Sequence, residues 1–145
     1  MVANRELKMG RFSVELDLAN NDDLALAKAG VISPDQVRRT RVSGVVDTGA
    51  ARLVLPESVV RTLGLDTSAT SKARYADGRV TERAIAKGPH LSYGGREGVF
   101  SAVVEPGCPS ALIGAIVLED LDFMVDCVGQ RLVPRDPDQI ISEIE

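Results

Sequence analysis

The fold of this chain is decided by the stretch Val42-Ser43-Gly44-Val45-Val46-Asp47-Thr48-Gly49-Ala50. Its first five residues predict a strand, which Gly44 interrupts, and Asp47 follows that strand directly. We therefore expect the Asp47 carboxyl group at the rim of the core, between the apolar interior and solvent. Thr48 can fix the local geometry through its hydroxyl group, and Gly49 lets the backbone approach a ligand closely because it has no β-carbon. A carboxylate held in this way is suited to acid–base chemistry on a water molecule.

The tripeptide Asp47-Thr48-Gly49 is moderate evidence when it is taken alone. At average residue usage it arises by chance in roughly three of every hundred chains of this length. The alternative interpretation is an ordinary turn after a strand, since Asp and Gly are common turn residues. Motifs elsewhere in the chain are needed to distinguish an ordinary turn from a catalytic site.

Length and composition are those of an ordinary globular protein. The 145 residues predict one domain over residues 1–145. Aromatic residues make up 3% of the chain and Trp is absent, so the core must consist of Val, Leu, Ile and Ala. The net charge of −4 argues against a nucleic-acid partner, because phosphate binding needs clustered positive charge.

Cysteine spacing and hydropathy bear on location. Cys108 and Cys127 have no metal-site spacing, and two free thiols in a reducing compartment are favoured over a disulfide. The sequence has neither a recognisable signal peptide nor an apolar run of the ~18 residues that a membrane span needs. We therefore expect a cytoplasmic protein without a membrane partner.

Many short apolar runs are separated by turn residues, which favours an all-β barrel or sandwich with two or three short helices. Asp77-Gly78 between two runs predicts a hairpin. The tail over residues 136–144 is compatible with a short helix or an edge strand. The role of residues 22–37 stays open between capping the barrel and adding to a contact between subunits. The expected strands are residues 12–18, 42–46, 52–55, 90–93, 99–104, 123–126 and 131–133, and the expected helices are residues 24–29, 56–63 and 116–121, with one helical turn after Pro34.

Two motifs in order resemble those of retroviral-type, retropepsin-like aspartic proteases. Val45–Ala50 is similar to the family's active-site strand and turn, and Ala111–Gly114 is similar to its second signature. The continuation to Asp126 is similar to single-domain bacterial members. Between the two signatures lies the Asp77-Gly78 hairpin, where the family has its substrate-covering flap. The motifs are short, so the strength of the resemblance lies in their order from about Val42 to Val133.

The resemblance implies a closed acid-protease barrel of six or more strands and a peptide or protein substrate. It implies that Asp47 is the catalytic carboxylate, that Thr48 locks the active-site turns of two subunits together, and that Gly49 offers its carbonyl to a bound peptide. Substrate binding is expected from the turn and the flap, at Ala50, Tyr75, Ala76, Asp77 and Gly78.

One Asp-Thr-Gly is too few for this chemistry. One group must deprotonate the water while another donates a proton to the scissile amide, and two close carboxyl groups that share one proton do both. A two-fold homodimer supplies the second Asp47. Apolar side chains are expected to line the cleft, drawn from Leu53, Val54, Ile85 and Val104.

The sequence departs from the retroviral pattern at two linked positions. Retroviral enzymes often carry an Asp and an Arg that pair where this chain has Ala51 and Ala115. Because both partners are missing, no unpaired charge is left behind. The flap is also poorer in glycine, with only Gly78 at its tip.

Other candidate sites are weaker. His90 is the only histidine and is expected on the surface or in a structural contact, while Cys108 lies in a turn with nothing local to activate it. No cofactor and no metal are expected, since carboxylate pairs such as Asp22-Asp23 lack metal-site spacing. The alternative function is a non-catalytic module that holds a peptide or a partner protein on the same dimeric barrel.

Overall fold

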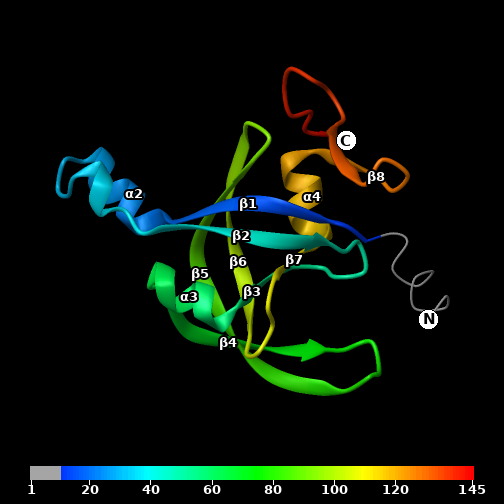
Figure 1. The fold of residues 1–145 in the computed structure, drawn as a ribbon, viewed down its shortest axis with the longest axis horizontal. Helices are drawn as coiled ribbons and strands as arrows, with labels where there is room; N and C mark the ends of the chain where they lie inside the picture. Colours follow the sequence, from blue (N-terminus) through cyan, green and yellow to red (C-terminus); the bar gives the residue numbers. More distant parts are fainter. Residues whose placement is uncertain (1–10) are drawn as a thin grey trace.

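The computed structural model describes residues 11–145, and their strands form a closed barrel. Six strands close the ring in the order β1-β2-β7-β3-β6-β5, with β5 pairing back onto β1. A further strand, β4, pairs with β5 outside the ring (Figure 1). The bounds are β1 Ser13–Asn20, β2 Arg39–Val46, β3 Leu53–Pro56, β4 Asp66–Arg74, β5 Val80–Tyr93, β6 Arg96–Glu105 and β7 Ala111–Ile113.

Three short helices and one 3-10 turn accompany the barrel, and a small hairpin follows it. The helices are α2 Asn21–Lys28, α3 Glu57–Leu63 and α4 Ala115–Leu121, the turn is η1 Pro34–Gln36, and the hairpin strands are β8 Phe123–Asp126 and β9 Arg131–Pro134. The prediction of an all-β, closed barrel of six or more strands with two or three short helices is confirmed. None of the helices in residues 11–145 has the length and apolar character needed to cross a bilayer.

The core is mainly aliphatic, as the composition predicts, but the three phenylalanines, Phe12, Phe100 and Phe123, are also buried in it. On β1, Leu16 and Leu18 point inward with 1% and 2% exposure, while Glu15 and Asp17, which alternate with them, point outward. That alternation is the period-2 pattern of a half-buried strand. Other side chains that are almost fully buried come from six further elements and include Val46, Leu53, Leu55, Leu63, Leu91, Ile113 and Leu121.

Two details of the predicted elements are wrong. The sequence favoured separate strands on either side of Gly88-Pro89, but β5 is one strand of 14 residues. A register shift between Lys87 and His90 absorbs the irregular residues, and Gly88 has φ +91°, so the strand bends at a bulge and does not end there. The tail beyond β9 forms neither of the two elements considered for it.

The excursion between β1 and β2 lies at the end of the barrel away from Asp47, because it precedes β2 and Asp47 follows it (Figure 1). The Asn20 side chain caps α2 by accepting from the Asp23 amide at 3.0 Å, and its amide group donates to the Leu63 carbonyl at 2.8 Å. Asp23 receives two bonds from the Arg38 guanidinium, at 2.8 and 2.9 Å. These contacts attach the excursion to the end of the barrel away from Asp47.

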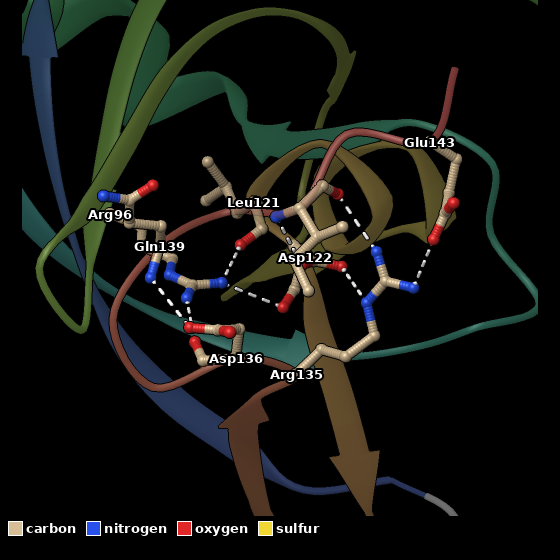
Figure 2. A network of polar contacts seen from close by, with 8 residues as sticks. Arg96, Leu121, Asp122, Arg135, Asp136, Gln139 and Glu143 are labelled. Carbon is tan, nitrogen blue, oxygen red and sulfur yellow. Dashed lines mark hydrogen bonds and ion pairs between the residues drawn. The ribbon is translucent and has the colours of Figure 1, made fainter.

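The C-terminal residues are fastened to the end of α4 by two arginines (Figure 2). Arg96, which is 9% exposed, donates to the carbonyls of Leu121 and Asp122 at 2.8 and 3.0 Å. Arg135 lies between the carboxylates of Asp122 and Glu143, each 2.9 Å away. Figure 2 shows how these contacts join the turn between β5 and β6, the last turn of α4 and the tail.

Candidate active site

Asp47 stands where β2 leaves the core. Its amide donates to the Ile113 carbonyl of the neighbouring strand β7 at 3.1 Å, and its own carbonyl accepts from the Ala50 amide at 3.1 Å, which closes the turn. The Gly49 amide donates to carboxylate oxygen Oδ1 at 3.0 Å. The Asp47 side chain is 18% exposed, and Thr48 and Gly49 are exposed. The carboxyl group therefore sits between core and solvent in a turn that fixes its direction.

The second signature supports this turn through its backbone. Amides at the start of α4 donate outward, from Ala115 to the Ala50 carbonyl and from Ile116 to the Ala51 carbonyl, both at 2.9 Å. A β-carbon at Gly114 would lie 2.4 Å from the Arg52 carbonyl oxygen, so only glycine permits the approach. Main-chain hydrogen bonds thus join the segments that a side-chain ion pair joins in retroviral enzymes.

Arg11 contacts the carboxylate. Its guanidinium bonds Asp47 oxygen Oδ2, while the side chain stays 45% exposed. The pairing of Ser13 with Val45 in β1 and β2 explains the contact, because the next outward position in that antiparallel register places Arg11 opposite Asp47. Both carboxylate oxygens consequently have donors within the chain. Sequence reasoning missed Arg11, although the strand register contained the signal.

A pocket of about 500 Å³ opens beside the Asp47 turn. Apolar groups of β3, β6 and β7 form one wall, and the inner edge of β4 forms the other. The lining residues are Gly49, Ala50, Ala51, Arg52, Val54, Ser71, Lys72, Ala73, Arg74, Tyr75, Val103, Glu105, Cys108 and Leu112.

The predicted cleft wall is partly wrong. Val54 lines the pocket, but Leu53, Ile85 and Val104 are buried at 1%, 5% and 5% exposure. Adjacent residues of a strand face opposite sides of the sheet, which explains the error. The prediction placed Val104 in the cleft, but Val103 lines the pocket and Val104 is buried. A run such as Val103-Val104 is apolar on both sides and carries no signal of which residue faces the pocket.

The predicted flap residues divide into two groups. Tyr75 lines the pocket together with Gly49 and Ala50, whereas Ala76, Asp77 and Gly78 lie in the exposed tip. The tip is a tight turn, in which Tyr75 donates its amide to the Arg79 carbonyl at 2.9 Å and accepts from the Gly78 amide at 2.9 Å. The structure therefore brings Tyr75 to the pocket and leaves the remaining tip residues in solvent.

The other candidates have structural explanations. His90 bonds Glu97 at 2.9 Å across β5 and β6. Cys108 and Cys127 are free thiols, as expected. No group of three or more His, Cys, Asp or Glu side chains with a metal-binding arrangement occurs within residues 11–145. Among the described residues that line the pocket, the carboxyl group is that of Glu105, which is bound to Tyr75 and Arg83.

Comparison with known proteins agrees with the geometry. A family model described as aspartyl protease matches residues 34–118, which is more than half of the chain. The match includes the Asp47 turn, the flap hairpin and the second signature. A search of curated proteins finds no match.

Proposed function

This chain belongs to the aspartyl protease family, and on that premise we propose that it is an endopeptidase in which a water molecule is activated between two Asp47 carboxyl groups. The observation that carries the proposal is the placement of Asp47. Its carboxyl group accepts a hydrogen bond from the Gly49 amide, and Gly49 and Ala50 of the same turn line a pocket of about 500 Å³. Of the described residues that line this pocket, Glu105 carries the carboxyl group, and it is bound by Tyr75 and Arg83, so Asp47 at the edge of the pocket is the candidate.

The second carboxyl group comes from a second copy of the chain. Thr48 and Gly49 are exposed next to Asp47, so two turns can meet on a two-fold axis. Carboxyl groups about 3 Å apart cannot both ionise, and the shared proton lets one act as base and the other as acid. Each Asp47 must leave Arg11 for this, because the guanidinium occupies carboxylate oxygen Oδ2.

The pocket indicates the kind of substrate. Its apolar wall includes Val54, Val103 and Leu112, which suits an apolar side chain of a bound peptide. An extended peptide fits between the Asp47 turn and β4 because β4 is paired on one side only. The protein therefore acts on extended polypeptide, and the cytoplasmic location predicted from the sequence belongs to the same proposal.

The Asp47→Asn variant tests the chemistry. Asparagine keeps the shape and the bond from Gly49 but cannot act as a base, so cleavage of an unfolded protein should fall by at least about 1,000-fold. Asp17→Asn is the matched control, since Asp17 pairs with Arg41 on the same two strands. Cleavage that survives in Asp47→Asn rules out the mechanism.

The second candidate function is a non-catalytic peptide-binding module. Arg11 favours it, because its guanidinium binds the carboxylate that would have to activate the water. A statine peptide separates the two functions, since its hydroxyl mimics the attacking water. Binding that is tight in the wild type and lost in Asp47→Asn supports the enzyme, whereas equal binding to both supports the module.

A further inference from the structure

Three side chains tie the flap to the barrel wall. The Tyr75 hydroxyl donates to Glu105 Oε2 at 2.7 Å and accepts from Arg83 Nε at 2.9 Å. The Arg83 guanidinium also lies 3.4 Å from Glu105 Oε1. The three come from different places in the fold, since Tyr75 directly follows β4, Arg83 lies near the start of β5 and Glu105 ends β6. We call this set the flap clasp.

Strand register puts the clasp together. Ile85 pairs with Val103 in β5 and β6, and two residues further along the same antiparallel register Arg83 faces Glu105. Both side chains are about three-quarters buried, at 24% and 21% exposure. The bond to Tyr75 is the main cause that raises the Arg83 pKa above its ordinary value, against the effect of burial. A charge-assisted hydrogen bond between side chains that are largely buried is stronger than one between exposed groups.

Tyr75 is the point at which the flap returns from solvent to the barrel. Residues 76–80 are exposed, whereas Tyr75 is half-buried. The Arg79 guanidinium lies 4.4 Å from the centre of the Tyr75 ring, so the turn itself also packs on this side chain. The tyrosine therefore carries the tip of the flap on one side and the bond to Glu105 on the other.

We propose that Tyr75 is a positioning residue, which holds the flap at a fixed height above the Asp47 turn before a peptide arrives. The inference rests on the proposed function, because the height of the flap matters to a peptide that lies beneath it. Tyr75 and Glu105 line the same pocket as Gly49 and Ala50, so the clasp sets the width of that pocket. A flap that is already ordered in the free protein loses less conformational entropy when substrate binds, so binding is tighter.

This role predicts a change in KM with little change in kcat. When the clasp is broken, the flap must be ordered by the substrate, and KM should rise roughly tenfold. The value of kcat should stay within about twofold, because Tyr75 does not touch the reacting atoms once the peptide is bound. A purely structural side chain would lower the amount of folded protein and leave KM unchanged.

Tyr75→Phe breaks the clasp by removing one oxygen atom. The matched control is Tyr93→Phe, since the chain has two tyrosines and Tyr93 contributes its ring to an edge contact with Phe123 at 5.5 Å. Amide hydrogen exchange of the full chain without substrate should become about tenfold faster over residues 72–80 in Tyr75→Phe. Exchange over β1 and β2 should be unchanged, and Tyr93→Phe should match the wild type.

A second pair of variants tests the acceptor. Glu105→Gln keeps an acceptor but removes the charge, and its control is Glu97→Gln, which alters another pair across the same two strands. If Tyr75 acts through Glu105, the rise in KM of the double variant Tyr75→Phe with Glu105→Gln should be smaller than the product of the single effects.

The outcomes separate the clasp from the chemistry. Exchange and KM in Tyr75→Phe that equal those in Tyr93→Phe overturn the clasp and leave the proteolytic function standing. A fall in kcat at constant KM also overturns it, since Tyr75 would then serve the chemical step. If neither the wild type nor any variant cleaves peptide, the proposed hydrolysis falls. The clasp still stands in that case, provided that Tyr75→Phe loosens the flap and weakens binding of a statine peptide tenfold.

Discussion

At the scale of single residues, Gly114 has the tightest surroundings near the site. A β-carbon there would meet two carbonyl oxygens, of Arg52 at 2.4 Å and of Ala50 at 2.8 Å, and backbone cannot swing aside as a side chain can. We expect Gly114→Ala to lower the free energy of unfolding by about 1–3 kcal/mol and to push the Asp47 turn out of place. Displacement by about 1 Å should reduce kcat/KM roughly 100-fold.

Gly44→Ala is the control for this prediction. Gly44 is also buried, but its β-carbon would meet the ends of flexible side chains, Leu16 Cδ1 at 2.9 Å and Ile113 Cδ1 at 3.0 Å. These methyl groups can rotate away, so the Asp47 turn should keep its place and kcat/KM should stay near that of the wild type. Equal loss of kcat/KM in both variants would show that general destabilisation, and not the turn, is responsible.

At the scale of elements, α4 links the active-site turn to the tail. Its first amides bind the turn, and Arg96 binds the carbonyls at its end. Replacing Arg96 with Met leaves the Leu121 and Asp122 carbonyls without that donor, and each such loss costs about 1–3 kcal/mol. We expect Arg96→Met to lower the free energy of unfolding by at least about 2 kcal/mol in urea denaturation.

Arg61→Met provides the comparison on α3. Arg61 is 70% exposed and pairs with Glu57 one turn earlier, so its loss should cost less than about 0.5 kcal/mol. If Arg96→Met is no worse than Arg61→Met, the arginine that Figure 2 places under the tail does not hold that end of α4.

The excursion between β1 and β2 predicts a pH dependence. Hydrogen bonds from the Arg38 side chain and amide lower the pKa of Asp23 from 3.8 to about 2. A carboxyl group with a lowered pKa stabilises the fold above its unfolded pKa, and that stability is lost as the pH falls from about 4 toward 2. The urea midpoint of Asp23→Asn should lie below that of the wild type at pH 6, and the difference should shrink below pH 4.

Asp22→Asn is the control. Asp22 is the neighbouring residue and is exposed, so the urea midpoint of this variant should equal that of the wild type over the whole pH range. A difference between Asp23→Asn and the wild type that stays constant down to pH 2.5 would mean that the Asp23–Arg38 pair does not act through its charge.

The elements also show which parts of the fold can be predicted from sequence. Turn residues such as Asp77-Gly78 and the alternation in β1 predict their elements well, because both depend on local backbone geometry. The bulge at Gly88 resembles a strand end in sequence, and only pairing with β6 on both sides of it shows that β5 continues. The directions of the Val103 and Val104 side chains follow from the pairing of β6 with β3 and β5. The residues that pair with Val103 are Val54 and Ile85, which are distant from it in the sequence.

At the scale of the whole molecule, one chain supplies one Asp-Thr-Gly carboxyl group, that of Asp47, whereas the proposed chemistry needs two. The Asp-Thr-Gly turn and the second signature identify Asp47 from sequence because they are contiguous motifs. Arg11 and Glu105 could not be found in this way, since strand pairing alone brings them to Asp47 and Tyr75. In the proposed mechanism the second carboxyl group belongs to another copy of the chain, so no stretch of this sequence can encode its position.

Dependence on concentration tests this symmetry. If two chains form one site, sedimentation at micromolar concentration should show a dimer, and activity should fall with the square of the protein concentration once the dimer dissociates. Asp47→Asn should remain dimeric, because Thr48 and not Asp47 is expected to hold the turns together. Activity that stays proportional to concentration in a chain that sediments only as a monomer would rule out the shared site.

The position of β7 has a consequence for synthesis. This strand fills the space between β2 and β3, although the ribosome makes it long after both of them. Until residues 111–113 emerge, the nascent chain exposes unpaired edges beside aliphatic side chains, which favours premature association with other chains. Pauses in translation between residues 56 and 111 would lengthen this interval, and a chaperone that shields extended apolar segments would protect the protein most during it.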